Sequence, residues 1–447
     1  MSAGSACYRP AVGENTRDAG LVRAVGPWAL AASIVNVVVG AGIFAAPAAL
    51  AASIGPYAPF AFLFCAIAIG AVAICFAEGG SRVPTSGGAY GYIETAFGPL
   101  AGYVSGSMLW FSDLLACGGI AAALGDVVSS LVAPEWQAVT RTGVVIVSVG
   151  SIALVNVCGV AHGARLVTVA ALVKLVPLVV FVLVGAAFVD GANFSNALPS
   201  ANTDIGHALI LALFTFTGLE TALCASGEVR DPSRTIPRAI ALAMISLAVI
   251  YIGVQIVAQG VLGGALATST APLADAMARV NPGLRALMLA GAAISMLGWL
   301  GSDILGTPRV LFAFARDGLM PRVLGRVHPT TRSPYVAILA YATAAVVLAL
   351  TGTFAELAVL STLLVTVTYI GGCAAAVVLA RRGVALAGTP LNFRWLPLAA
   401  VVGIGSSIAL IVLAARMEIL GLFATIAVAA TIYLVQTRAL AARQTST

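Results

Sequence analysis

The stretch SIVNVVVGAGIFAAPAAL at residues 33–50 is apolar enough to lie in a membrane, yet it contains residues that weaken a helix. Gly40, Gly42 and Pro47 lie inside the hydrophobic run. In a helix interior, glycine costs about 1 kcal/mol and proline about 3 kcal/mol relative to alanine. Unwound backbone at membrane depth survives only where it is buried in protein or lines a wet cavity. The stretch therefore predicts an interrupted helix.

A second stretch of the same kind, ALILALFTFTGLETALCASG, occupies residues 208–227. Thr215, Thr217 and Gly218 come just before Glu220 in this run. Either stretch alone is weak evidence for an interrupted helix, because glycine and proline are common in membrane helices for packing reasons. The two lie five spans apart, which is typical of inverted repeats with a binding site at the bilayer midplane.

The whole composition indicates an all-α membrane protein. The chain has 447 residues, of which 60% are hydrophobic and 9% charged, whereas a soluble domain has about 25% charged residues. Apolar runs of about 20 residues can each cross a bilayer. We predict twelve spans, at 28–54, 57–80, 99–131, 142–160, 164–188, 204–226, 237–261, 284–316, 334–351, 354–380, 395–415 and 417–437.

The arginines predict the orientation, because cytoplasmic loops are enriched in basic residues. With the N-terminus inside, 18 arginines fall in cytoplasmic segments and four in outer segments. We therefore expect cytoplasmic tails at 1–24 and 438–447, a transporter domain at 25–437, and a multi-pass protein of the inner cell membrane. The net charge of +6 is then an orientation signal, so a nucleic-acid partner is not expected.

Metal sites and enzymatic centres have little support in the sequence. The seven cysteines form no CxxC pair, and the three histidines lie singly near span ends. We expect no metal, no cofactor and no catalytic residues, because a structural or catalytic metal needs three or four clustered ligands.

The two predicted breaks suit one kind of ligand. Free N–H groups at the start of a half-helix attract a carboxylate, and freed carbonyls accept hydrogen bonds from an ammonium. An α-amino acid carries both groups, and glycines let it approach the backbone closely.

Five motifs, in order along the chain, resemble those of the amino acid–polyamine–organocation transporter superfamily. They are VGAGIFAAP (39–47), GGSRVPTSGGAYGYIETAFGPLAGYVSG (79–106), FTFTGLETA (214–222), GEVRDPSRTIPRAI (227–240) and FARDGLMPRVLGRVHPTTRSPYVAI (314–338). The resemblance implies the leucine-transporter-type fold: a 5+5 inverted repeat, with repeats at about 28–188 and 204–380, and two additional C-terminal helices at about 395–437.

The resemblance also implies which residues hold the substrate. The helix 1 break holds the carboxylate and the helix 6 break holds the amino group, so the matching residues are Gly40, Ala41, Gly42 and Ile43, then Phe214, Thr215, Phe216, Thr217 and Gly218. Alanine replaces the common serine at position 41, so carboxylate binding would rest on backbone N–H groups alone. Phe214 matches an aromatic lid over the substrate, or else is an ordinary packed phenylalanine.

Lys174 is the only lysine among the 23 basic residues and lies deep in the span at 164–188. Arginine stays protonated in a protein, whereas a lysine taken out of water can release its proton. In relatives a helix 5 lysine takes the place of a sodium ion and bonds the helix 1 carbonyls, and Lys174 matches that position. We therefore expect a coupling role, with permanent pairing to a carboxylate as the alternative.

Three acids, Asp113, Glu220 and Asp303, lie deep in spans, where charges are costly and functional. Asp113 and Asp303 are expected to face the pocket, which favours a cationic group on the substrate; either could instead neutralise Lys174 or cap a half-helix. Glu220 matches a gating or proton-sensing glutamate of the family. Glu78 lies near a span end, where an interfacial position is expected.

We expect a secondary transporter of amino acids, leaning to cationic amino acids or polyamines, proton-coupled and independent of sodium, working as a monomer or homodimer in the lipid bilayer. An obligate exchanger of amino acid for amine is the alternative within transport. A non-transporting nutrient receptor would carry longer soluble tails.

Overall fold

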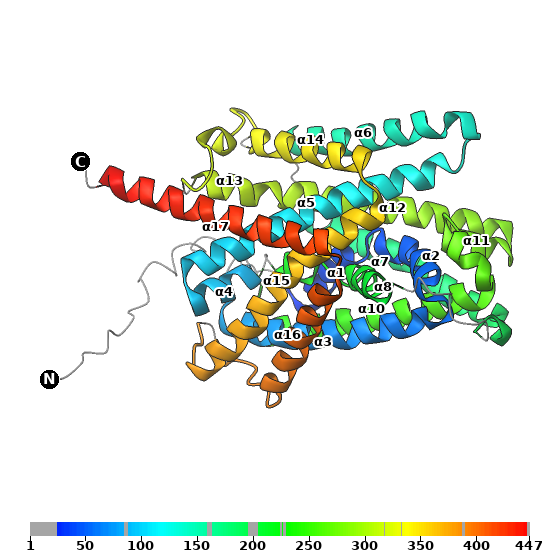
Figure 1. Cartoon of the computed structure of the whole chain (residues 1–447), viewed down its shortest axis with the longest axis horizontal. Coiled ribbons are helices and arrows are strands. Elements are labelled where there is room, and N and C mark those ends of the chain that lie inside the picture. Colours follow the sequence, from blue (N-terminus) through cyan, green and yellow to red (C-terminus); the bar gives the residue numbers. More distant parts are fainter. Residues whose placement is uncertain are drawn as a thin grey trace.

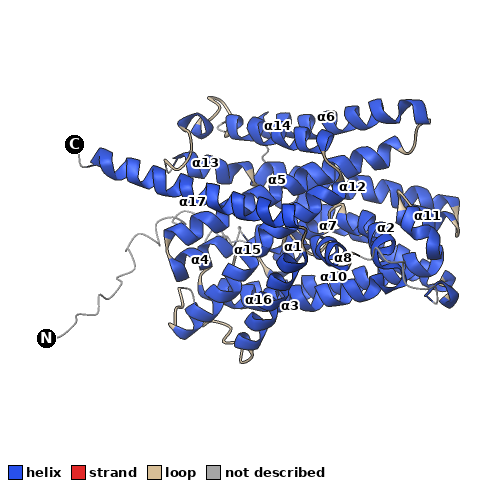
Figure 2. Cartoon of the chain, in the orientation of Figure 1, coloured by secondary structure: helices blue, strands red, loops and turns tan. Residues whose placement is uncertain are grey.

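The structure is a computed structural model that describes residues 25–84, 88–158, 163–194, 204–223, 226, 229–316, 318–331, 333–386 and 389–444. The predicted tail at 1–24 and residues 445–447 of the predicted C-terminal tail lie outside these residues. The described chain consists of helices joined by loops (Figure 2), and its β contacts are limited to an isolated pairing of Val25 with Val229.

The first part of the chain forms helices and short 3-10 turns. They are α1 (Pro27–Val38), α2 (Gly42–Ile54), η1 (Gly55–Tyr57), α3 (Ala58–Arg82), α4 (Ala89–Phe97), α5 (Pro99–Ser129), α6 (Pro134–Cys158), α7 (Gly163–Gly185), η2 (Ala186–Phe188) and η3 (Gly191–Phe194).

The second part begins with another interrupted helix, and two further helices end the described chain. Its elements are α8 (Ile205–Phe214), α9 (Leu219–Ala222), α10 (Pro232–Leu262), η5 (Gly263–Thr268), α11 (Pro272–Ala278), α12 (Pro282–Gly306), α13 (Pro308–Arg316), η6 (Arg322–Gly325), α14 (Tyr335–Thr351), α15 (Phe354–Arg381), α16 (Leu396–Leu413) and α17 (Arg416–Gln444). Many helices begin at a proline, whose fixed φ and missing N–H suit the first turn.

Each predicted span coincides with one helix or with a broken pair of helices. By length and apolar composition, nine helical runs of the described chain can cross a membrane, and three shorter apolar helices accompany them. The all-α membrane class is thereby confirmed.

Several predicted boundaries were wrong. Helix α6 begins at Pro134, not at 142, and α17 continues to Gln444 through most of the predicted tail. The predicted span at 284–316 corresponds to the helical run Pro282–Arg316, in which α13 follows α12 directly after Thr307 because Pro308 opens a new first turn. A proline has no N–H to continue the helical ladder of the preceding turn.

The broken helices lie at the centre of the bundle (Figure 1). Helix α1 contacts α7, α9, α10 and α12, while α2 contacts α8 and α10. The long helices α5 and α15 pack along each other, as do α3 and α10. Helices α4 and α13 lie towards one end of the bundle and α11 at the other (Figure 1). This arrangement surrounds both breaks with protein, which is the condition for unwound backbone at membrane depth.

Candidate binding site at the two helix breaks

Both interrupted helices predicted from the sequence are confirmed. The first break spans residues 39–41, between α1 and α2, and the second spans residues 215–218, between α8 and α9. The first was predicted at 40–43, so Gly42 and Ile43 instead open α2. Gly218 has φ +115°, a backbone conformation that favours glycine, and a Cβ there would lie 3.0 Å from Val37 Cγ1. The second break therefore packs against the last turn of α1, next to the first break.

The first break leaves N–H groups unpaired. Among the described residues, the N–H groups of Ala41, Gly42 and Ile43 have no hydrogen-bond acceptor, whereas the Phe44 N–H donates to the Ala41 carbonyl at 3.0 Å. These groups stand at the N-terminus of the 13-residue helix α2. Such a terminus attracts anions, because the N–H dipoles point outward.

The second break leaves carbonyls unpaired. The chain at 215–217 turns tightly, with Thr215, Phe216 and Thr217 each donating its N–H to a carbonyl three residues earlier. Within the described chain, the carbonyl oxygens of these three residues accept no hydrogen bond. They can therefore accept from a cationic donor.

A narrow cavity of about 20 Å³ lies between the breaks. Its wall is formed by both broken helices together with α5, α12 and α15, through Val37, Val38, Gly40, Ala41, Gly42, Ser112, Asp113, Ala116, Ile120, Phe214, Thr217, Gly218, Glu220, Thr221, Trp299 and Ser361.

Eight of the thirteen predicted site residues line this cavity, and five, including Lys174, do not. The eight are Gly40, Ala41, Gly42, Asp113, Phe214, Thr217, Gly218 and Glu220. Ile43, Thr215, Phe216 and Asp303 are buried behind the wall. The Thr215 hydroxyl donates to the Ala212 carbonyl, and Phe216 packs against Phe62 and Tyr251.

The Thr307 hydroxyl contacts both Asp113 and Asp303, but the two carboxylates differ in the lengths of the hydrogen bonds they accept. Asp303 accepts short hydrogen bonds from Thr307 Oγ1 at 2.7 Å and Tyr341 Oη at 2.6 Å. Asp113 accepts only longer contacts, at 3.2 Å from Thr307 and 3.4 Å from Thr221. No basic side chain of the described residues forms an ion pair with either acid. Asp113 is thus the acid that is free to bind a ligand in the cavity.

Glu220 closes the N-terminus of α9. One oxygen accepts the Gly218 N–H at 3.0 Å, and the other accepts the Tyr369 hydroxyl at 3.0 Å. The carboxylate therefore links the second break to α15.

Lys174 is fully buried and reaches the first break from α7. Its Nζ donates to the Asn36 carbonyl at 2.9 Å and the Val39 carbonyl at 3.3 Å. Ser295 of α12 donates to the Val39 and Gly40 carbonyls at 3.0 and 3.3 Å. Within the described chain, no carboxylate lies in ion-pair range of Lys174. The Lys174 ammonium therefore links α7 to backbone carbonyls at the first break and in the last turn of α1.

Sequence reasoning missed several residues around the cavity. Trp299 lies beside Gly40, and Ser112 on α5 shares a hydrogen bond with Ser361 on α15. Thr307 and Tyr341 hold Asp303. A tryptophan or hydroxyl inside a span is a weak signal, since neither residue type is costly in a membrane helix.

Comparisons with known proteins agree with this geometry. A family model described as amino acid permease matches residues 25–436. The chain is 27% identical to the serine/threonine exchanger SteT of Bacillus subtilis, over 82% of this chain and 86% of the relative. It is 25% identical to the branched-chain amino acid permease BcaP of the same organism, over 71% and 72% of the two chains. An uncharacterized transporter of Mycobacterium tuberculosis is 36% identical over 66% of this chain and 67% of its own.

The match covers nearly the whole helical bundle, including both breaks and the cavity between them. Members of this family are transporters, not enzymes. This chain belongs to the amino acid permease family.

Proposed function

We propose that the chain is a secondary transporter that binds an amino acid between the two helix breaks. The observation that carries this proposal is the pairing of free groups across one cavity. Of these free groups, the N–H groups of Ala41 and Gly42 belong to residues that line the cavity and suit a carboxylate, and the carbonyl of Thr217, which also lines it, suits an ammonium. Side-chain hydroxyl donors are not needed for the carboxylate, which accounts for alanine at position 41.

Within this proposal the favoured substrates are cationic amino acids or polyamines. Asp113 lines the cavity, has only long hydrogen bonds and forms no ion pair within the described chain. A buried carboxylate without a counter-charge is costly, and a guanidinium or second ammonium would offset that cost.

Coupling is proposed to use protons and no sodium. The Lys174 ammonium bonds carbonyls of the first break that a bound cation would otherwise satisfy. Loss of its proton during transport would loosen the bond between α7 and α1. We further propose that the protein lies in the inner cell membrane with both termini in the cytoplasm, as a monomer or homodimer.

Obligate exchange of an amino acid for an amine is the alternative. The name of one relative, a serine/threonine exchanger, supports exchange but not an amine as the exchanged substrate. A nutrient receptor that keeps the cavity but does not transport is a weaker rival.

A ligand panel tests the substrate class directly. Purified protein in detergent is heated with arginine, ornithine, putrescine, alanine, serine or leucine, since a ligand that binds the folded state raises the Tm. We expect the three cations to give the largest shifts. Shifts confined to serine, alanine or leucine would contradict the cationic proposal and leave the amino acid site intact. Uptake without internal substrate would argue against obligate exchange.

A further inference from the structure

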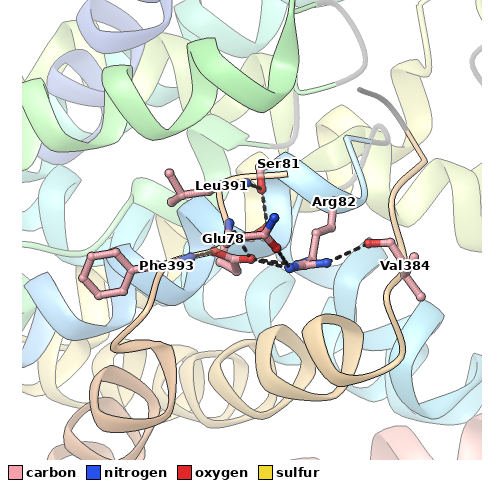
Figure 3. Close-up of polar contacts among 7 residues, drawn as sticks. Glu78, Ser81, Arg82, Val384, Leu391 and Phe393 are labelled. Atoms are coloured by element: carbon pink, nitrogen blue, oxygen red, sulfur yellow. Dashed lines mark hydrogen bonds and ion pairs between the residues drawn. The ribbon is translucent and has the colours of Figure 1, made fainter. Parts of the chain in front are cut away.

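The end of α3 carries a buried ion pair far from the cavity. Glu78 and Arg82 have side chains that are 0% and 4% exposed, and the carboxylate lies 2.8 Å from the guanidinium. Glu78, expected near a membrane interface, thus lies at the end of α3 and is buried within the protein. The physical reason is that the connection between α15 and α16 covers the end of α3 (Figure 3).

We call residues 384–386 and 391–393 of this connection the strap. The strap lacks regular secondary structure, so its backbone groups must find partners elsewhere. Glu78 accepts the N–H groups of Asn392 at 3.2 Å and Phe393 at 2.9 Å. The Leu391 N–H donates to Ser81 Oγ at 3.0 Å (Figure 3).

Arg82 completes the attachment on the other side. Its guanidinium donates to the Val384 carbonyl at 3.0 Å and to the Asn392 side-chain oxygen. Its own carbonyl accepts the Leu386 N–H at 2.8 Å. Three residues in the last turn of α3 therefore hold both ends of the strap.

This attachment is too strong to break in every cycle. Four of the six contacts involve a charged side chain, and such bonds are roughly twice as strong as neutral ones. Conformations that exchange during transport must all be appreciably populated. Breaking four charge-assisted bonds together would make the open form too rare to take part.

We propose that Glu78 and Arg82 are positioning residues that keep α3 fastened to the strap throughout the transport cycle. Helix α3, the end of α15 and the start of α16 then move as one body. Helix α3 also packs along α10 and α16. The movement that opens the cavity must take place at other contacts, such as that between the two breaks.

A disulfide across the attachment tests this proposal. Ser81→Cys and Leu391→Cys are combined, oxidised with copper phenanthroline in proteoliposomes, and compared with each single variant. Disulfide formation is scored by loss of maleimide labelling, and transport by uptake of radiolabelled arginine or serine, whichever the wild type carries. We expect the oxidised double variant to transport within about twofold of the reduced protein. Transport that stops on oxidation and recovers with dithiothreitol would overturn the proposal.

A second variant separates positioning from a general loss of stability. Glu78→Gln should slow uptake, while Asp126→Asn, which removes the exposed pair with Arg141, should not. Oxidising the Ser81→Cys and Leu391→Cys pair in the Glu78→Gln background should restore uptake, because the disulfide replaces the lost attachment. Uptake that stays low after complete cross-linking would contradict a positioning role. Neither experiment depends on which amino acid is carried.

Discussion

At the residue scale, the two aspartates of the cavity region have different surroundings. Tyr341 and Thr307 satisfy Asp303 at 2.6 and 2.7 Å, so its oxygens are engaged. Asp113 lines the cavity and has only contacts of 3.2 Å or more. The sequence placed both acids in the pocket, because the depth of a residue in a span is visible but its rotational position on the helix is not.

Asp113→Asn should weaken the binding of arginine, ornithine or putrescine much more than that of alanine. Losing a charge-assisted pair in a desolvated site costs about 2–5 kcal/mol. Dissociation constants from calorimetry measure this loss, with Asp303→Asn as the control for a nearby acid that lies behind the wall. Equal losses for charged and neutral ligands would show that Asp113 has a structural role.

Gly298 on α12 provides the space that Lys174 occupies. A Cβ at this position would lie 2.9 Å from Lys174 Cε and 3.3 Å from Nζ. Gly298→Ala should displace the ammonium from the Asn36 and Val39 carbonyls and slow uptake roughly tenfold or more, since a hydrogen bond from a charged group contributes about 1.5–3 kcal/mol.

Gly301→Ala is the matched control, because a Cβ at Gly301 on the same helix would meet nothing within 4 Å. The initial rate of uptake should be near wild type in this variant. Equal rates for Gly298→Ala and Gly301→Ala would show that the position of Lys174 does not limit transport.

At the scale of elements, the break between α8 and α9 depends on the left-handed conformation of Gly218. A residue with a Cβ in this conformation costs about 1–2 kcal/mol. We expect Gly218→Ala to lower the Tm of the protein, because its Cβ would also press on Val37 at 3.0 Å.

The comparison for this variant is Gly405→Ala in α16, where a Cβ would meet nothing within 4 Å. Alanine favours a helix interior by about 1 kcal/mol over glycine, so this change should leave the Tm unchanged or raise it. A Gly218→Ala protein as stable as wild type would mean that the second break does not need the left-handed turn.

The helices and their breaks were easier to predict from the sequence than the contacts between distant segments. The breaks followed from Gly40, Gly42 and Gly218, because helix-weakening residues in an apolar run are a local signal. The attachment of α3 to the strap joins Glu78 to Phe393, which are far apart in sequence and held by backbone N–H groups that no side chain reveals. Helix ends were predicted least well, as at Pro134, because a helix can start inside a polar loop.

At the scale of the whole molecule, the fold places a lysine and an aspartate beside the two helix breaks, each from a different helix. Lys174 approaches the first break from α7, and Asp113 lines the cavity from α5. No ion pair joins them in the part of the chain that the structure describes. Substrate binding and coupling can therefore be changed separately by mutation.

Lys174→Ala should remove the bridge between α7 and α1 and abolish uptake or its dependence on pH, with the folded protein still eluting as a single species in size-exclusion chromatography. Lys174→Arg keeps the charge but cannot release a proton. It should fail to support uptake driven by acid outside. Partial exchange in the arginine variant would instead favour a permanent bridge.

The most direct test of the account is uptake of radiolabelled arginine into proteoliposomes without sodium, driven by an inward proton gradient. We predict that the wild-type protein concentrates arginine under these conditions and that the Lys174→Arg variant does not. Uptake that requires sodium in the wild type and is unchanged in Lys174→Ala would contradict the account.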